Sequence, residues 1–381
     1  LVLAVSMPIV AFAVIGGFMS KAMAREDSYQ YLRIFEDVVS LILNNYVEEV
    51  NVDKVMHGAM HGLADGLDPD SAYLDAAQVK TLDKGDSLAA GQTGLEITRQ
   101  YYLRVIAARD GSPAAKAGLM PGDYIRAIDG QSTRDTTVYE GQRLLRGKPG
   151  TKVRLTVLRG NAVEPHEIDL VREDLPALAV KSRMAGASVG YVRVAEFGKN
   201  TAEQIKSEIA SVQKSGAKGV VIDLRGTAFG DVDTGLAAAR LFVKSGVLAY
   251  RQDRGKEKEA INAATGDGAI TVSTVLLTDN GTSNGAEVFA AALAGNKRAQ
   301  LIGERTLGRA AHQKLVRLPD GGALMLTHLI YLTPASVAIH EKGLAPDVAV
   351  QQPEIDFGQP QPTADATLDK AIATLTAKAA A

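Results

Sequence analysis

GVVIDLRG, residues 219–226, is a short apolar run that ends in a charged turn containing a glycine. Strands buried on both faces read as continuous apolar runs of this kind, whereas half-exposed strands alternate. The segments around it, 201–216 and 233–246, have helical patterns, and another apolar run follows at 274–279. This alternation of strands and helices predicts an α/β domain with a largely parallel sheet.

The segment from Gly91 to Glu173 differs, with short strand-like stretches separated by glycine turns. One helix-like stretch, TTVYEGQRLLRG at 136–147, interrupts them. This pattern predicts a small β-rich module with its own turns and core positions. The strand-like stretches are TGLEIT (93–98), YLRVIAA (102–108), DYIRAIDG (123–130), KVRLTVLRG (152–160) and HEIDLVRE (166–173).

Residues 28–84 are predicted to be helical, because apolar side chains recur there at steps of three and four residues. The pattern stops at Asp68-Pro69, a turn signal. His57 and His61 have a spacing that occurs in metal sites. No Glu follows His57 and no third ligand is evident in the sequence, so we predict no metal site.

The N-terminal stretch LVLAVSMPIVAFAVIGGFM, residues 1–19, carries no charge. At about 1.5 Å per residue, a helix of this length spans on the order of 28 Å, close to the apolar core of a bilayer. The length favours an uncleaved anchor, whereas Ala22-Met23-Ala24 is the small-x-small pattern of a signal-peptide cleavage site. With either one, we expect the rest of the chain to lie outside the cytoplasm.

Composition excludes several classes of protein. The 381 residues hold 42 Lys plus Arg against 44 Asp plus Glu, which argues against a nucleic-acid binder with a basic surface. Because there is no cysteine, the chain has no disulfide, no thiolate metal site and no cysteine nucleophile. The apolar share of 46% is ordinary for a globular chain that buries a core.

Seven motifs occur in order along the chain. They are LDPDSAY (67–73), GLEI (94–97), AGLMPGDYIRAIDG (117–130), VGYVRVAEF (189–197), VVIDLR (220–225), IGERTLG (302–308) and LTHLIYLTPASVAIHEKGLAPDVAV (326–350). Together they resemble the carboxy-terminal processing peptidases, also called tail-specific proteases. The resemblance implies an N-terminal helical part, a PDZ domain that binds substrate C-termini, and an α/β core of the ClpP/crotonase type with a Ser-Lys dyad and no cofactor.

The N-terminal apolar segment and the resemblance, which covers about residues 28–381, together predict how the chain is divided. The expected parts are a signal peptide or anchor (1–25), a helical region (26–88), a PDZ domain (89–175), the α/β core (176–352), and a linker with a C-terminal helix (353–381). The N-terminal segment predicts a place in the bacterial cell envelope, periplasmic or extracytoplasmic, with the chain secreted or anchored to the membrane by residues 1–19. Members of the family assemble through their terminal helices, so a homo-oligomer is expected on resemblance alone.

The peptide-binding residues implied by the PDZ resemblance are Gly94, Leu95, Glu96 and Ile97. A glycine-led loop offers free backbone N–H groups to a terminal carboxylate, and the strand after it pairs with the peptide by β-augmentation. The groove would close against the helix from Val138 to Leu145. The alternatives are a PDZ fold kept only for packing, or one used as a regulatory lid.

The catalytic positions depart from the family pattern. The family nucleophile lies three residues before a Glu in a stretch resembling Ser-Ala-Ser-Glu, which puts Asn284 at that position if Glu287 is the Glu. The family base is the Lys of a Phe-Gly-Lys-Gly pattern, and the corresponding residue here is Arg309. The supporting Gln is retained as Gln313.

The loop that helps to form the family's oxyanion hole is also changed. Where the family has Asn-Asn-Pro-Gly-Gly, residues 226–230 read Gly-Thr-Ala-Phe-Gly, so Phe229 replaces one glycine and Gly230 remains. A Ser-Lys dyad needs a hydroxyl and an amine that loses its proton. Asn284 offers an amide, a poor nucleophile, and the Arg309 guanidinium stays protonated near neutral pH. These combined changes favour a natural pseudoprotease.

A rebuilt site is the alternative, with Ser283 as nucleophile and His312 as base. A Ser-His pair is competent if the two groups lie in hydrogen-bond contact and are oriented by a third. Ser283 is more simply interpreted as the N-cap of the helix that follows, a role that Asn284 would also suit. Arg309 would pair with a peptide carboxylate in the old active site, or form a structural ion pair with Glu287 or Asp223.

The sequence therefore predicts an inactive tail-specific-protease-like envelope protein that binds peptides or protein C-termini. Its concrete form would be an adaptor or regulator of an active relative. An active serine endopeptidase and a membrane-tethered scaffold are the other two hypotheses.

Overall fold

The computed structural model describes residues 29–84, 89–160, 164–353, 355–359 and 362–380. These residues form two compact units, the first ending at Leu63 and the second beginning at Ala64. The leader or anchor expected at residues 1–25 lies outside the described residues and stays a prediction. Among the described helices, none combines the length and the apolar character that crossing a bilayer requires.

The first unit is helical, as its apolar periodicity predicts. Residues 29–45 form one helix, and α2 (Val52–Asp65) begins in this unit and ends in the second. Large apolar side chains are exposed along the first described helix and the turn after it. They are Tyr29, Tyr31, Leu32, Ile34, Val38, Leu41, Ile42, Leu43, Tyr46 and Val47.

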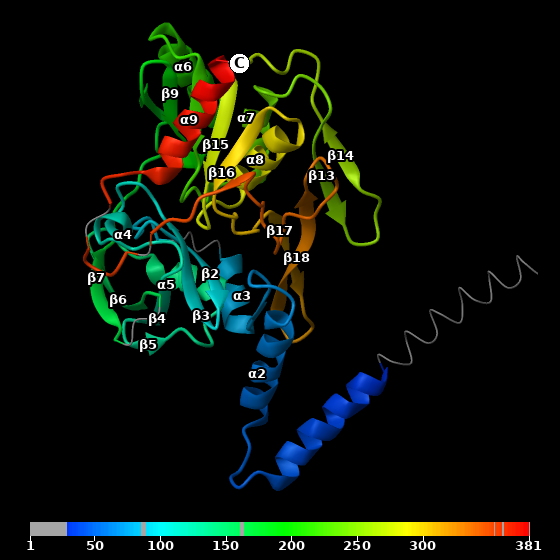
Figure 1. Cartoon of the computed structure of the whole chain (residues 1–381). Helices are drawn as coiled ribbons and strands as arrows, with labels where there is room; N and C mark the ends of the chain where they lie inside the picture. Colours follow the sequence, from blue (N-terminus) through cyan, green and yellow to red (C-terminus); the bar gives the residue numbers. More distant parts are fainter. Residues whose placement is uncertain (1–28, 85–88, 161–163, 354, 360–361, 381) are drawn as a thin grey trace, which may run out of the picture. The chain divides into compact units, whose positions relative to one another are not determined.

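In the second unit the β-rich module is an antiparallel sheet in the order β2-β3-β4-β6-β7, with β5 beside β4 (Figure 1). Its edge strand β2 (Leu95–Gln100) packs against α5 (Val138–Leu145). Gly141 allows this approach, because a Cβ there would lie 2.8 Å from Cδ1 of Ile97. The other elements are β3 (Tyr102–Ala108), α4 (Pro113–Lys116), β4 (Tyr124–Ile128), β5 (Gln131–Ser132), β6 (Lys152–Leu158) and β7 (His166–Val171).

The α/β part contains the parallel sheet that GVVIDLRG predicts. Its strand order is β19-β16-β15-β11-β9-β8, and only the β8–β9 pair is antiparallel among these described strands. The strands are β8 (Lys181–Met184), β9 (Val189–Arg193), β11 (Gly219–Asp223), β15 (Ser273–Thr278), β16 (Ala299–Gly303) and β19 (Val348–Ala349).

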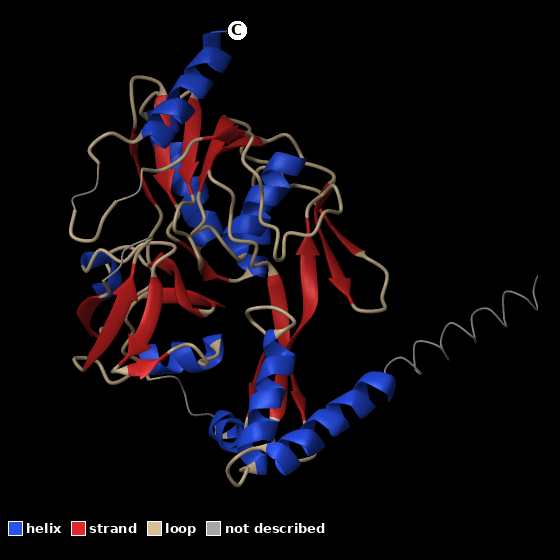
Figure 2. Ribbon diagram, turned by 60° about the horizontal axis from the view of Figure 1, so that its bottom comes forward, coloured by secondary structure: helices blue, strands red, loops and turns tan. Residues whose placement is uncertain are grey.

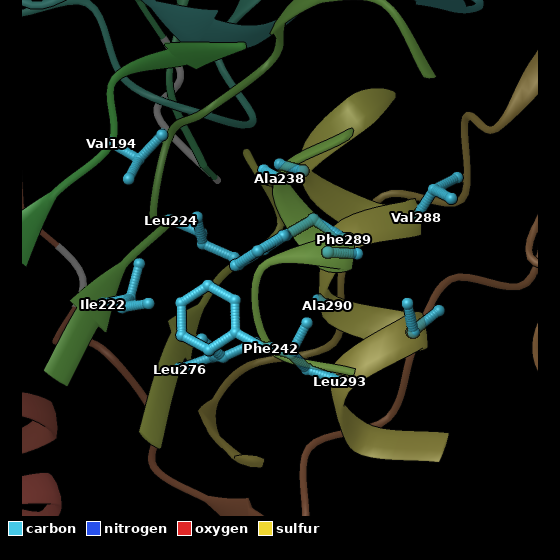
Figure 3. Close-up of a cluster of buried hydrophobic side chains, with 14 of the residues drawn as sticks. Val194, Ile222, Leu224, Ala238, Phe242, Leu276, Val288, Phe289, Ala290 and Leu293 are labelled. Atoms are coloured by element: carbon cyan, nitrogen blue, oxygen red, sulfur yellow. The ribbon is translucent and has the colours of Figure 1, made fainter. Parts of the chain in front are cut away.

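Helices cover both faces of this sheet, which explains why the central strand β11 is buried throughout. Val220 and Ile222 face one cluster, together with side chains of α6 (Thr201–Lys214), α7 (Val232–Arg240) and α8 (Gly285–Gly295). Figure 3 shows Ile222 and Leu276 of the sheet grouped with Phe242, Phe289 and Leu293. Val221 faces the opposite cluster, under α9 (Ala366–Ala380).

A third sheet joins the LDPDSAY segment to the α/β part. Its short strand β1 (Ala72–Leu74) pairs antiparallel with β18 (Ala323–Leu332), and α3 (Ala76–Asp83) packs Val79 onto Leu74. Figure 2 shows the three sheets as separate groups of red arrows. The remaining strands are β13 (Val247–Asp253), β14 (Glu259–Asn262), β17 (Ala311–Arg317) and the two-residue pair β10 (Glu196–Phe197) and β12 (Phe229–Gly230).

Candidate functional site

Three loops meet at one edge of the parallel sheet, where β11, β15 and β16 end. Ligands bind at this carboxyl edge in open α/β sheets, because the loops after neighbouring strands converge there. Backbone hydrogen bonds hold the loops together: Ser283 N–H donates to Thr227 O at 3.0 Å, and Leu307 N–H donates to Thr282 O at 3.0 Å. The expected nucleophile, base and oxyanion-loop positions therefore lie in one connected structure.

Asn284 occupies the turn between β15 and α8 in a rare backbone conformation, with φ 53° and ψ −124°. Residues other than glycine seldom adopt a positive φ, and Asn tolerates it better than most. Its side-chain Nδ2 donates a hydrogen bond of 2.9 Å to the carbonyl of Ala228, and its N–H donates to Arg309 O at 3.0 Å. The amide therefore links the turn to the oxyanion-loop segment.

Ser283 is not the N-cap of α8, contrary to the sequence-based interpretation. Asn284 holds that position, and its side chain makes no capping hydrogen bond because it reaches Ala228 O instead. The Ser283 side chain is 1% exposed, and its Oγ has no hydrogen-bond partner within the described part of the chain. The positive φ at Asn284 explains the error, since sequence patterns for helix caps assume an extended residue before the first turn.

Glu287, on the first turn of α8, holds the base loop in place from inside the protein. Its carboxylate accepts hydrogen bonds from the backbone N–H of Gly308 at 2.6 Å and of Arg309 at 2.7 Å, and from the Thr306 hydroxyl. Burial raises the pKa of the Glu287 carboxyl to about 7, although these donors favour the charged form.

Arg309 extends from the base position into a buried cluster of charges. Its Nη1 donates to Glu96 Oε1 at 2.7 Å, and its Nε donates to Asp70 Oδ2 at 3.1 Å. Nη1 also reaches the Ile97 carbonyl at 3.4 Å. Burial lowers the pKa of the Arg309 guanidinium, but the two carboxylates outweigh it and raise the pKa overall. The side chain therefore stays protonated and is no base.

The ion-pair partners expected for Arg309 are wrong. Glu287 contacts Arg309 through the backbone N–H of that residue and not through its guanidinium. Asp223 pairs instead with Arg225, and the two charged groups are 2.6 Å apart. Tyr191 also donates its hydroxyl to Asp223 at 2.8 Å. The actual partners are Glu96 and Asp70, and Asp70 lies 239 residues earlier in the chain, in the LDPDSAY motif. Sequence reasoning missed Asp70, and the only signal was that a charged residue occupies a motif that packs on the core.

The remaining predicted site residues lie on elements around the loops. His312 Nε2 is 3.1 Å from the Tyr331 hydroxyl, and Gln313 Nε2 donates to the Thr327 hydroxyl at 3.3 Å. Phe229 and Gly230 form β12, which pairs with β10. Within the described residues, no group of three or more carboxylate or imidazole side chains has an arrangement that would hold a metal ion.

The expected peptide groove lies between β2 and α5. Gly94 has φ 79°, the left-handed conformation that the glycine-led loop requires, and a Cβ there would meet the Ser112 side chain. Leu95 and Ile97 point into the core of the module, whereas Glu96 points towards Arg309. The outer edge of β2 is available in the sheet order for an added strand.

Both walls of this groove are in contact with other segments of the same chain. On the β2 side, Arg309 contacts Glu96 and the Ile97 carbonyl. On the α5 side, Gln78 of α3 donates a hydrogen bond to Glu140, and Tyr139 packs against the cluster beneath α3. A peptide that adds to β2 must therefore compete with contacts made inside the chain.

Three models of known families match parts of the chain. Peptidase family S41 matches residues 188–350, a PDZ domain matches 104–159, and the N-terminal domain of the activating protease CtpB matches 16–78.

Full-length relatives are similar across these regions. The carboxy-terminal-processing protease of Bartonella bacilliformis is 30% identical over 360 residues, which cover 90% of this chain and 83% of that protein. The carboxy-terminal processing protease CtpA of Bacillus subtilis is 32% identical over 315 residues, or 82% of this chain and 67% of that protein. The solved structure of a photosystem II D1 C-terminal processing protease has a TM-score of 0.68 and 27% identity, and the match covers 83% of this chain and 92% of that one.

Proposed function

The chain belongs to peptidase family S41, the carboxy-terminal processing proteases, and from this membership we propose that it binds free C-termini of peptides or proteins without hydrolysing them. One observation carries the proposal: the side chains at both expected catalytic positions are engaged in contacts inside the chain. Asn284 donates its amide to Ala228 O, and Arg309 pairs with Asp70 and Glu96.

The nucleophile position supports this proposal through chemistry and through geometry. An amide nitrogen is a weak nucleophile, and the Asn284 amide is already engaged as a donor. Cleavage also needs a base that accepts the proton of the attacking group. The guanidinium at 309 is charged at every physiological pH, and its neighbouring carboxylates reinforce that charge.

The PDZ domain supplies the binding half of the proposal. Its edge strand β2 and the glycine-led loop at Gly94 have the arrangement that captures an extended peptide with a free carboxylate. Arg309, at the expected base position, contacts the Ile97 carbonyl on that strand. Peptide binding to β2 is therefore coupled to the conformation of the Arg309 side chain. We infer that ligand binding displaces this contact.

The test uses two peptides of the same sequence, one with a free C-terminus and one with an amidated C-terminus. We expect the first to bind the purified protein, the second to bind much more weakly, and both to be recovered intact by mass spectrometry. Equal affinity for the two peptides would contradict C-terminal capture. Absence of binding to both would favour the scaffold hypothesis.

The active endopeptidase with Ser283 and His312 is tested with an unfolded protein substrate. Under our proposal neither the native chain nor Ser283→Ala cleaves it. Cleavage by the native chain that disappears in Ser283→Ala would establish the rebuilt site instead. The matched control is Ser211→Ala, which alters a hydroxyl on an exposed part of α6.

The cellular setting is a further part of the proposal. The uncharged residues 1–19 support a location in the cell envelope, secreted or anchored to the membrane. The exposed apolar side chains of residues 29–47 support self-association through this helical part. An active family member is the partner that an inactive adaptor of this kind would regulate.

A further inference from the structure

The dipeptide Asn284-Gly285 has a chemical reactivity of its own. When glycine follows asparagine, the missing Cβ lets the glycine nitrogen approach the carbon of the asparagine side-chain amide. Ring closure between them gives a five-membered succinimide. The chain contains one other Asn-Gly pair, Asn280-Gly281, four residues earlier in the same loop. The two pairs differ in backbone conformation and in hydrogen bonding.

Ring closure requires the glycine nitrogen to eclipse the asparagine Cβ, viewed along the bond from Cα to C. The backbone nitrogen and Cβ of an L-residue are about 120° apart around that bond. The ψ of −124° at Asn284 therefore rotates the Gly285 nitrogen into the plane of Cβ. Helical and extended residues have ψ values far from this one, so they must rotate before they cyclise.

The surroundings of Asn284 act in both directions. Its Nδ2, the nitrogen that leaves, donates a hydrogen bond of 2.9 Å to the Ala228 carbonyl, and this bond breaks when ammonia leaves. Asn284 is also the N-cap of α8, and the positive end of a helix dipole favours negative charge there. Charge of that sign develops on the amide oxygen during attack and remains on the product carboxylate.

We propose that Asn284 is a self-modifying residue, which in the folded chain cyclises onto Gly285 and is then hydrolysed to aspartate or isoaspartate. In the first step the Gly285 nitrogen loses its proton and forms a bond to Cγ of Asn284, and ammonia leaves with that proton. In the second step one water opens the ring. Opening at the side-chain carbonyl gives aspartate, and opening at the main-chain carbonyl gives isoaspartate. No oxidant or other co-reactant takes part.

The modification changes the contact that Asn284 makes. A carboxylate cannot donate to Ala228 O, so two acceptors then face each other where the amide formed a hydrogen bond. Isoaspartate also lengthens the main chain at the start of α8. The oxyanion-loop segment would lose its link to the turn. This inference does not depend on whether the chain binds or cleaves peptides.

Asn280-Gly281 is a matched internal control for the experiment. It is also an asparagine followed by a glycine. However, the Gly281 N–H donates to the Asp279 carboxylate at 3.0 Å, and the φ of Asn280 is not positive. Both pairs fall within the tryptic peptide 259–297, so fragment ions assign the converted residue. The folded full chain is incubated at mildly alkaline pH, sampled over time and digested, with a parallel sample in denaturing urea.

In the folded chain we expect Asn284 to convert about tenfold faster than Asn280. The reason is that ring closure releases part of the strain in the Asn284 backbone and so lowers the activation barrier. In urea we expect the two rates to be similar. Equal or slower conversion of Asn284 in the folded chain, or faster conversion of Asn284 in urea than in the fold, would overturn the proposal. Asn284→Gln should abolish the signal at this position. Gly285→Ala is unsuitable, because its Cβ would lie 2.3 Å from the Asp231 carbonyl.

Discussion

The Arg309 guanidinium donates a hydrogen bond of 2.7 Å to the Glu96 carboxylate, across 213 residues of sequence. This contact joins the base position of the protease core to the peptide loop of the PDZ domain. Asp70 completes the cluster from the segment before β1. Arg309 thus connects three separate parts of the fold.

Arg309→Met should destabilise the protein strongly. It leaves Asp70 and Glu96 without a counter-charge, and their side chains are only 5% and 18% exposed. Removing one partner of a fully buried pair typically costs about 3–5 kcal/mol, which sets the upper end for this partly buried cluster. Urea unfolding measures the shift in midpoint. The control is Arg154→Met, which removes an exposed partner of Asp169 and should change the midpoint little. Equal midpoints for the two variants would show that the buried cluster is not stabilising.

Glu287 should make the stability depend on pH. Its pKa is raised to about 7 in the fold, so its contribution is complete below the unfolded value and is lost as the pH rises to 7 and above. A shift of this size corresponds to a loss of about 3 kcal/mol between acidic and neutral pH. Unfolding of native chain and Glu287→Gln at several pH values measures it. The difference between them should shrink as the pH rises, and a constant or growing difference would refute this assignment.

Gln78→Ala should tighten peptide binding. It removes the hydrogen bond from Gln78 of α3 to Glu140 on the α5 wall of the groove. A ligand that enters the groove must compete with this hydrogen bond. One such bond corresponds to an increase in affinity of about two- to tenfold, measured by titration with a free-acid peptide. Thr81→Ala, on the same helix, is the control, because its hydroxyl bonds only within α3. A weaker affinity for Gln78→Ala would mean that α3 supports the groove.

Restoring the dyad residues should not restore hydrolysis. In Asn284→Ser with Arg309→Lys, the new lysine lies beside Asp70 and Glu96, and these carboxylates raise its pKa and keep it protonated. We expect no cleavage of an unfolded substrate near neutral pH. Adding Asp70→Asn and Glu96→Gln should lower that pKa and allow slow cleavage at alkaline pH. Full activity of the double variant would show that the carboxylates do not control the base.

The order of elements follows from the sequence because local patterns determine it. The apolar run at 219–226 predicts a strand covered on both faces, as the structure has it. The assignment of Asn284 and Arg309 to the catalytic positions stays a prediction from the motifs. Local patterns of this kind do not predict contacts between distant segments. The pairing of Arg309 with Asp70 brings together segments 239 residues apart, in a region where β1 pairs with β18. Beside Asn284, α7 approaches α8 so closely that a Cβ on Gly235 would lie 2.1 Å from Gly285 O, a contact that no local pattern predicts.

The most direct test of the account follows one free-acid peptide in a single experiment. It is titrated into the purified chain by calorimetry, and the contents of the cell are then analysed by mass spectrometry. If the chain captures free C-termini without hydrolysis, binding is saturable, is weakened by amidation of the peptide C-terminus, and leaves the peptide at full length. Recovery of shortened peptide from the native chain, and of intact peptide from Ser283→Ala, would contradict it.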